Sequence, residues 1–309
     1  MLRSIVNSLP YPIKQGVKYI YGAIPPRFRY GKAFWSTYNF LQESQWWSKE
    51  KLEEYQMREL EKLLKHVYED VPYYRMVFDE RGLKPKDIQD FNDLKKIPYL
   101  TKDTFKENFN NKKIISKNIK LSTLSMSHTS GTTGKPLQFY ENKDIGAKEW
   151  AFIYHQWSRV GYKPGDKRIE LRGAINKKKP IFYSKLGNIL RFSPIIENKE
   201  KANLYLKKIE KFGAQFLHGY PGAIASFALL IKQYKLNINF KLKAILFASE
   251  IIYEWERKIV EEVFSCRIFS HYGCAEKIIL AAECEKNQIY HCIPQYGITE
   301  FEPQTKEII

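Results

Sequence analysis

From about residue 120 onward, short apolar runs alternate with amphipathic stretches, and this alternation constrains the fold more than any other feature of the chain. The strand-like runs are Arg168–Gly173, Ala214–Gly219, Lys243–Ser249 and Cys266–Gly273. The stretches with helical spacing between them are Asn198–Gly213, Gly222–Leu236 and Glu254–Phe264. Strands that alternate with helices are typical of parallel β-α units, so the sequence predicts an α/β fold in which helices cover a sheet.

The first third of the chain has helical signals instead. Apolar residues recur at helical spacing from Leu52 to Val67, and Ser48 can cap the start of that helix. Prolines at positions 72 and 98 interrupt the pieces that follow. We therefore expect a mostly helical region through about residue 115.

The charge of the chain favours anionic partners. Lys and Arg outnumber Asp and Glu 51 to 34, a net charge of +17, so the surface attracts anions such as nucleotides, coenzyme A or acidic polysaccharide. The basic residues are scattered, without a helix-turn-helix or RNA-binding signature, and we expect no nucleic-acid partner. Four cysteines do not make a disulfide scaffold, and no signal-peptide core follows Met1. The cytoplasm is the expected compartment.

The amino-terminal segment differs from the rest in composition. Residues 1–47 begin with a mixture of Arg, Lys and bulky apolar side chains, and no run reaches the roughly 18 apolar residues needed to cross a bilayer. We interpret this segment as a basic amphipathic arm that either folds back on the domain or lies on an anionic membrane. Residues 48–309 are expected to form one domain.

Three loops follow predicted strands, where ligands bind in parallel sheets. They are Gly219-Tyr220-Pro221, Ser249-Glu250 and the segment from His271 to Glu276. A fourth loop, Thr129–Lys135, has the sequence Thr-Ser-Gly-Thr-Thr-Gly-Lys. Its hydroxyls, its close-approaching backbone N–H groups and its lysine suit phosphate oxygens, although a plain hairpin turn is the alternative.

These motifs resemble those of a known superfamily. Thr129–Pro136 resembles the phosphate loop of the adenylate-forming superfamily, which includes acyl-coenzyme A synthetases and luciferases. Tyr272–Glu276 resembles its Tyr-Gly-x-Thr-Glu element, and Ser249-Glu250 its adenine-contacting step. The likeness is greatest to the phenylacetate-coenzyme A ligase family, in particular its capsular-polysaccharide biosynthesis branch. The segments that carry it are residues 41–56, 71–75, 100–108, 171–173, 218–224 and 281–297.

The resemblance implies a fold, a chemistry and a set of site residues. The fold would be the large amino-terminal domain of these proteins, with stacked β-sheets covered by helices. ATP and Mg²⁺ would be the cofactors, and the acid's carboxylate would attack the α-phosphorus, with Glu276 as the Mg²⁺ ligand and Lys135 as a second catalytic residue. Nucleotide contacts would come from Thr129, Ser130, Gly131, Thr132, Thr133, Gly134, Lys135, Ser249, Glu250, His271, Tyr272 and Gly273.

The acid would be held at His218, Gly219, Tyr220 and Pro221, near the helix that carries Trp150, Tyr154, His155 and Trp157, although ordinary core packing is the alternative for these aromatics. The acceptor would be coenzyme A or a sugar or amine, and family relatives leave a homodimer open. The expected role is acid activation in capsular or cell-surface polysaccharide biosynthesis. A non-catalytic nucleotide-binding accessory protein, possible at a membrane, is the alternative.

The sequence departs from the family pattern at several points. Ala275 replaces a Thr or Ser near the α-phosphate, and Lys177-Lys178-Lys179 stands where phenylacetate ligases have a glycine-rich segment. The family's ribose-binding aspartate and its carboxy-terminal lid domain are not found before Ile309, so we expect a truncated chain with poor turnover, or else a degenerate member. Cys284 and His291 resemble half of a zinc site whose remaining ligands would lie further on, and we expect no zinc in this chain.

Overall fold

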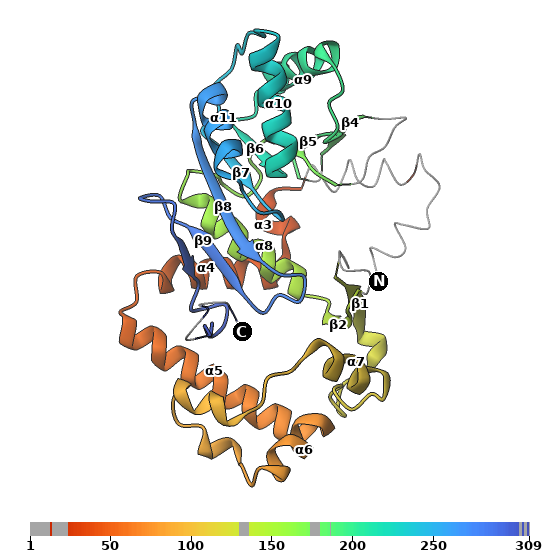
Figure 1. Ribbon diagram of the computed structural model, residues 1–309, viewed down its shortest axis with the longest axis vertical. Coiled ribbons are helices and arrows are strands. Elements are labelled where there is room, and N and C mark those ends of the chain that lie inside the picture. Colours follow the sequence, from red (N-terminus) through yellow and green to blue (C-terminus); the bar gives the residue numbers. More distant parts are fainter. Residues whose placement is uncertain are drawn as a thin grey trace. The chain divides into compact units, whose positions relative to one another are not determined.

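The computed structural model describes residue 13 and residues 24–129, 136–173, 180–185, 187–302, 305 and 308 (Figure 1). The chain divides into two compact units. Unit 1 comprises residues 1–38, 150–272 and 281–291, and unit 2 comprises residues 39–149, 273–280 and 292–309. None of the boundaries between these units falls at residue 47, and the predicted division into an arm at 1–47 and a domain at 48–309 stays a prediction.

Unit 1 is built on an eight-stranded sheet with the order β10-β9-β8-β7-β6-β3-β5-β4. The strands are β3 (Arg168–Leu171), β4 (Ile181–Ser184), β5 (Ile189–Phe192), β6 (Phe216–Gly219), β7 (Ala244–Phe247), β8 (Arg267–Gly273), β9 (Leu280–Glu283) and β10 (Tyr290–Cys292). Strands β5, β3, β6, β7 and β8 pair in parallel, and β4 pairs antiparallel with β5. The predicted α/β class is confirmed.

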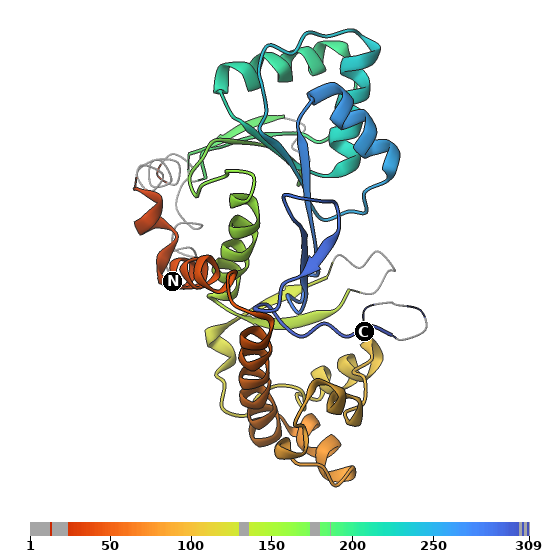
Figure 2. The same ribbon diagram turned by 90° about the vertical axis from the view of Figure 1, so that its left-hand side faces the viewer.

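Helices cover both faces of this sheet. One face packs against α9 (Lys199–Phe212), α10 (Pro221–Gln233) and α11 (Glu254–Phe264), and the other packs against α8 (Ile145–Ser158). Two further helices are α3 (Pro26–Arg29) and α4 (Gly31–Ser44), and the Phe34 ring of α4 lies 5.7 Å from the Tyr154 ring of α8. The apolar side chains of Ile169 and Leu171 lie in one core with α9, α10 and α11. The opposite face meets α8, where the Trp157 ring lies 4.9 Å from that of His218; Figure 2 shows α8 in green.

Local signals set the ends of α9 as the sequence predicts. The Asn198 side chain accepts a hydrogen bond from the backbone N–H of Lys201, which caps the first turn. Gly213 follows the last turn with φ of 68°, a left-handed conformation that favours glycine. The helix therefore begins after Asn198 and ends before Gly213, as the sequence predicts.

Unit 2 is mostly helical, as predicted. Its elements include α5 (Lys49–Asp70), α6 (Pro72–Glu80), α7 (Lys102–Asn110) and the short 3₁₀ helices η1 (Pro85–Asp87), η2 (Phe91–Lys96) and η3 (Leu121–Thr123). Ser48 caps α5 by accepting from the N–H of Lys51 at 3.3 Å, and Leu60, Leu64, Phe78 and Ile88 form the buried core. No helix within the described ranges is long and apolar enough to cross a membrane.

Two further strands of unit 2 flank the Ser/Thr/Gly loop. Strands β1 (Leu124–His128) and β2 (Gln138–Asn142) pair antiparallel, with Leu124 opposite Asn142 and His128 opposite Gln138. The two strands therefore form a β-hairpin. Residues 130–135 between them lie outside the described residues, so their phosphate-binding role stays a prediction. The two sheets belong to different units, so their stacking stays a prediction.

Candidate functional site

A cavity of about 470 Å³ in unit 2 brings together three segments that are far apart in the sequence. Its lining consists of Leu100, Thr101, Lys102, Phe105, Thr129, Leu137, Phe139, Glu276 and Ile278. Two predicted site residues, Thr129 at the start of the hydroxyl-rich loop and Glu276, therefore lie on one cavity. Its lining offers hydroxyl, ammonium and carboxylate groups together with apolar side chains.

Thr129 holds the two ends of its loop together. Its backbone N–H donates to the carbonyl of Leu137 at 2.9 Å, and its hydroxyl oxygen accepts from the N–H of Leu137 at 2.9 Å. The hydroxyl proton of Thr129 is then free to donate to a ligand oxygen. The rest of the predicted phosphate loop, Ser130, Gly131, Thr132, Thr133, Gly134 and Lys135, lies outside the described residues.

Glu276 is followed in the sequence by Lys277, whose side chain contacts other residues. Lys277 forms an ion pair with Glu141 and also donates to the carbonyl of Ala275 at 3.1 Å. Within the described part of the chain, no side chain forms an ion pair with the carboxylate of Glu276. Carboxylate oxygens are the ligands that Mg²⁺ prefers, so the site fits a hard cation shared with phosphate oxygens.

The amino terminus of α7 also reaches this cavity, and our sequence analysis missed it. Thr101 caps α7 by accepting from the N–H of Thr104 at 3.2 Å, and Lys102 is the first helical residue. The first turn of a helix carries partial positive charge, and Lys102 adds a full charge. The signal was available as a Thr cap before a helical stretch, but nothing local ties residue 101 to residues 129 and 276.

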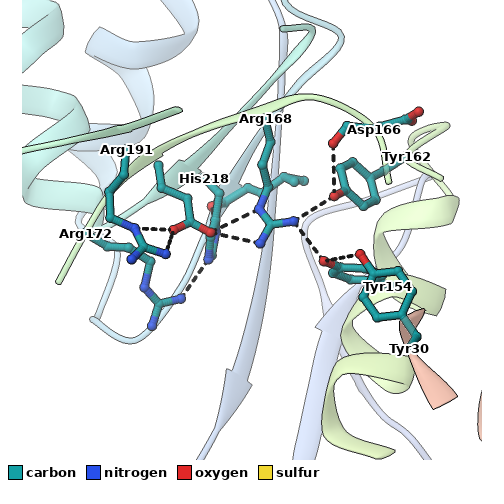
Figure 3. Close-up of polar contacts among 10 residues, drawn as sticks. Tyr30, Tyr154, Tyr162, Asp166, Arg168, Arg172, Arg191 and His218 are labelled. Carbon is teal, nitrogen blue, oxygen red and sulfur yellow. Dashed lines mark hydrogen bonds and ion pairs between the residues drawn. The ribbon is translucent and has the colours of Figure 1, made fainter. Parts of the chain in front are cut away.

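In unit 1, strand β3 carries a row of charged side chains that the sequence analysis did not single out. Arg168 and Glu170 are each only 3% exposed. The guanidinium of Arg168 donates to Glu170 at 2.9 and 3.1 Å and to the hydroxyls of Tyr154 and Tyr162 at 2.8 and 2.7 Å (Figure 3). Arg191 donates to the other oxygen of Glu170 at 2.6 and 2.8 Å.

This network fixes the charge state of Glu170. Burial alone raises the pKa of a carboxyl group, but the surrounding charges, that of Arg168 foremost, outweigh burial and lower the pKa of Glu170 to about 2. Tyr154 and Trp157 are buried beside the network with stacked rings 5.4 Å apart. Core packing is therefore the right interpretation for these two aromatics.

His218 lies opposite Glu170 on the neighbouring strand β6, and its imidazole is neutral. Its Nδ1 lies 2.7 Å from the carbonyl oxygen of Leu246, so Nδ1 carries the proton and donates it. Its Nε2 accepts from Nη1 of Arg172 at 2.7 Å (Figure 3). Complete burial, and then the charge of Arg172, lower the pKa of His218 to about 3.

Several predicted substrate and nucleotide residues meet Arg172 at the carboxyl ends of β3, β6 and β7. Nη2 of Arg172 donates to the Ser249 hydroxyl at 3.4 Å, and its guanidinium lies 5.7 Å from the centre of the Tyr220 ring. A Cβ atom at Gly219 would lie 2.4 Å from the carbonyl oxygen of Leu171, so only glycine fits there. Pro221 begins α10.

The remaining predicted residues lie nearby in the same unit. The carboxylate of Glu250 accepts from the N–H of Gly222, and burial followed by the charge of Glu256 raises its pKa. Nδ1 of His271 is buried without a hydrogen-bond partner among the described residues, and burial, then the charge of Arg172, lowers its pKa to about 4. Tyr272 is 49% exposed. The structure shows no ligand contact for any of them.

The units divide the predicted site. Thr129, Gly273 and Glu276 belong to unit 2, whereas His218–Pro221, Ser249, Glu250, His271 and Tyr272 belong to unit 1. Strand β8 links the two sets, because it ends at Gly273. Cys284 and His291 also lie in unit 1, and no group of three metal-ligating side chains occurs among the described residues.

Comparisons with known proteins agree with this fold. No model of a protein family matches the chain. Protein CapK of Staphylococcus aureus is 27% identical over 295 residues, which cover 94% of this chain and 64% of CapK. Phenylacetate-coenzyme A ligase of Escherichia coli is 36% identical over 123 residues, or 39% of this chain and 27% of the ligase. The chain thus spans less than two thirds of the length of these relatives.

Solved structures give the same fold. The crystal structure of 2-hydroxyisobutyryl-CoA ligase in complex with 2-HIB-AMP and CoA superposes with a TM-score of 0.64, over 85% of this chain and 58% of that one. Its postadenylation state with 2-HIB-AMP gives a TM-score of 0.63. Both are 17% identical in sequence to this chain, so the likeness concerns the fold.

Proposed function

We propose that this chain, which is similar in sequence to CapK and to phenylacetate-coenzyme A ligases, is an adenylate-forming protein of that family and activates a carboxylic acid with ATP. An oxygen of the acid's carboxylate attacks the α-phosphorus of ATP. The bond from that phosphorus to the bridging oxygen of the β-phosphate breaks, pyrophosphate leaves, and an acyl adenylate forms. A second step then transfers the acyl group from AMP to an acceptor.

The observation that carries this proposal is the shared cavity of Thr129 and Glu276. Thr129 can donate to a phosphate oxygen while its hydroxyl oxygen accepts from Leu137, and Lys102 with the α7 amino terminus adds positive potential at the same cavity. Glu276 would hold Mg²⁺, which when bound neutralises charge on the phosphates. Lys277 forms an ion pair with Glu141 and not with Glu276, so the negative charge of Glu276 is available to a cation.

Acid-dependent release of pyrophosphate tests the proposal. We expect the natural full-length protein, given Mg-ATP and a panel of carboxylic acids, to release pyrophosphate with at least one acid. Replacement of the loop lysine, Lys135→Met, should reduce that rate, whereas the surface variant Lys232→Met should not, because Lys232 pairs with Glu262 on an exposed helix face. Release that does not depend on any acid would contradict the proposal.

Coenzyme A is the first acceptor to test, because the ligase relatives bear its name. A sugar or amine acceptor in capsular polysaccharide synthesis is a narrower proposal that only the name of CapK supports. Thioester formation with coenzyme A, followed by mass spectrometry, separates the two: an acyl adenylate that persists with coenzyme A and is consumed by an amino sugar favours the second.

A non-catalytic nucleotide-binding protein is the second candidate, and Ala275 is the observation that favours it. Ala275 lies one residue before Glu276 and offers no hydroxyl donor. Loss of one such donor can cost on the order of ten- to a thousandfold in rate. If the protein is a slow enzyme, Ala275→Thr should raise pyrophosphate release at least tenfold. Binding of Mg-ATP without turnover in both forms favours the second candidate. Peripheral membrane contact and a homodimer stay predictions.

A further inference from the structure

We propose that Arg172 recognises a carboxylate oxygen of the acid substrate, and that His218 is the positioning residue that holds the Arg172 guanidinium in place. This inference rests on the proposed function and adds to it a residue that determines substrate class. It follows from the pattern of β3, from the charges around Arg172 and from the rigidity of its partners.

The pattern of β3 directs Arg172 to the polar face of the sheet. Side chains alternate along a strand, so Arg168, Glu170 and Arg172 share the face opposite to that of Ile169 and Leu171. Glu170 is paired in register with His218 on the neighbouring strand β6. Arg172 follows at the carboxyl end of β3, the end where parallel sheets bind their ligands.

Among the residues that the structure describes, Arg172 forms no ion pair with a carboxylate. Glu170 is shared by Arg168 and Arg191 (Figure 3). The two side chains that accept hydrogen bonds from Arg172 among the described residues, His218 and Ser249, are both neutral. An arginine is always charged in proteins, and an anion nearby offsets the cost of burying part of that charge.

The other groups around Arg172 do not supply that anion. Tyr220 presents its ring to the guanidinium, and His271 is neutral at physiological pH because burial and Arg172 lower its pKa to about 4. The acidic residue next in sequence to Ser249 is Glu250, and its carboxylate accepts from the N–H of Gly222 at the start of α10. Because no described side chain supplies an anion to Arg172, an oxyanion of a ligand is the partner that fits this arrangement.

The guanidinium is held rigidly by the groups it contacts. The His218 ring is fixed by the Leu246 carbonyl on one side and by the Trp157 ring on another. Ser249 has φ of 72°, a left-handed conformation that non-glycine residues adopt at a cost of order 1 to 3 kcal/mol and that clusters at ligand sites. Donors fixed in advance need little reorganisation when a carboxylate binds.

Arginine binds carboxylates through paired hydrogen bonds, which lysine cannot reproduce. The carboxylate has two sources: the reacting group of the acid, or a second carboxylate carried by the same acid. The two sources share one chemistry and predict different substrates. A second carboxylate makes dicarboxylic acids the preferred class, whereas recognition of the reacting group leaves simple monocarboxylic acids as substrates.

Ligand-observed saturation-transfer NMR without ATP tests the inference independently of catalysis. The probes are butyrate, succinate and the uncharged butyramide, and the proteins are the full-length wild type, Arg172→Gln, Arg172→Lys and Arg159→Gln. We expect wild type and the surface control Arg159→Gln to bind succinate or butyrate but not butyramide. Arg172→Gln should lose at least tenfold in that affinity, with Arg172→Lys intermediate. Equal binding by wild type and Arg172→Gln, or no binding of either acid by wild type, would overturn the inference.

Two variants of His218 test its positioning role. In His218→Asn the amide still reaches the Leu246 carbonyl but not Arg172, whereas in His218→Gln the side-chain oxygen reaches Arg172. We expect His218→Asn to raise the KM for the acid by about as much as Arg172→Gln while the KM for ATP changes less than twofold. His218→Gln should retain most of the affinity. A raised KM for ATP or coenzyme A in place of the acid would show that Arg172 binds a phosphate, contrary to the proposal.

The outcomes also separate this inference from the proposed function. If wild type releases no pyrophosphate but its succinate binding depends on Arg172, the activity fails and the recognition role stands. If wild type releases pyrophosphate and Arg172→Gln keeps its affinity for acids, the activity stands and the recognition role fails. Thermal melting of each variant, compared with wild type, identifies any variant that is unfolded, and Arg172→Lys then serves as the milder substitution.

Discussion

Charged residues are used in opposite ways in the β3 network of unit 1 and at the cavity of unit 2. In the β3 network, Arg168, Glu170 and Arg191 are paired with one another before any ligand arrives. At the cavity, Lys277 is paired with Glu141, but Lys102 and Glu276 have no ion-pair partner among the described residues. Paired charges of this kind hold structure, whereas charges left without a partner on a cavity are available to a ligand.

This difference separates two kinds of mutational effect. A change in the buried pairs should act on the stability of the fold, because it leaves an uncompensated charge inside the protein. A change at the cavity should act on activity with little effect on stability, because its polar groups face an opening. Arg172 lies between these cases, because it contacts the buried His218 but forms no ion pair among the described residues.

The largest effect is expected for Glu170→Leu. It leaves Arg168 buried without its carboxylate, which should lower the free energy of unfolding by about 3 to 5 kcal/mol. Urea denaturation measures this loss, and Glu262→Gln, at an exposed pair with Lys232, should stay within about 0.5 kcal/mol of wild type. The double variant Arg168→Met with Glu170→Leu should regain part of the loss. Equal stability of Glu170→Leu and wild type would show that the ion pairs of the β3 network do not stabilise the fold.

Glu276→Gln should show the reverse pattern. Loss of the carboxylate that we assign to Mg²⁺ should reduce pyrophosphate release by about a hundredfold or more, while the melting temperature without ligand stays close to that of wild type. Glu141→Gln frees Lys277 to approach Glu276 and should reduce the rate less than Glu276→Gln does. A variant Glu276→Gln with wild-type turnover would mean that the cavity is not the catalytic site.

Acid pH should weaken the buried layer of unit 1. The pKa of His218 is about 3 in the folded chain, below its ordinary value of 6.5, so the unfolded chain takes up a proton first as pH falls. Stability is then fully present above pH 6.5 and is lost toward pH 3, at up to about 1.4 kcal/mol per pH unit. Below pH 4.5 the depressed pKa of Glu170 acts in the same direction.

Urea denaturation at a series of pH values from 7 to 4.5 measures this dependence. We expect a loss of about 2 to 3 kcal/mol from His218 over that range. His218→Gln cannot titrate there, so its free energy of unfolding should change less steeply with pH, by up to about 1.4 kcal/mol per pH unit, which corresponds to one proton. Parallel curves for the two proteins would show that His218 is not buried in its neutral form.

The smallest effect is expected for Thr101→Ala. Its hydroxyl oxygen accepts from the N–H of Thr104, so the substitution removes the cap of α7 and should cost about 1 kcal/mol. Because this oxygen is already used within the protein, the KM for ATP should rise less than threefold. Thr101→Ser keeps the cap and should restore the stability. A large rise in KM without a loss of stability would assign Thr101 a direct contact with ATP.

Local signals in the sequence predicted most of the strands and helices. The four runs predicted as parallel strands correspond to β3, β6, β7 and β8, and Asn198 and Gly213 bound α9 as expected. These features depend on residues close in sequence, which is why pattern and capping chemistry suffice. The role of Glu250 at the start of α10 depends on a tertiary contact with Gly222, and the sequence did not indicate it.

The charged face of β3 could have been noticed. A parallel strand covered on both faces is normally a continuous apolar run, and "RIELRG" breaks that rule at every second residue. Alternation of this kind indicates a polar layer inside the protein. The meeting of residues 101, 129 and 276 at one cavity has no such signature, because it depends on how distant segments fold together.

Titration calorimetry with Mg²⁺ and the non-cleavable analogue α,β-methylene-ATP, performed on the full-length wild type and on Glu276→Gln, tests the central claim most directly. The account predicts one site per chain in the wild type, an affinity that depends on Mg²⁺, and at least a tenfold loss of that dependence in Glu276→Gln. Binding that is absent in the wild type, or that is identical in the two proteins with and without Mg²⁺, would contradict it.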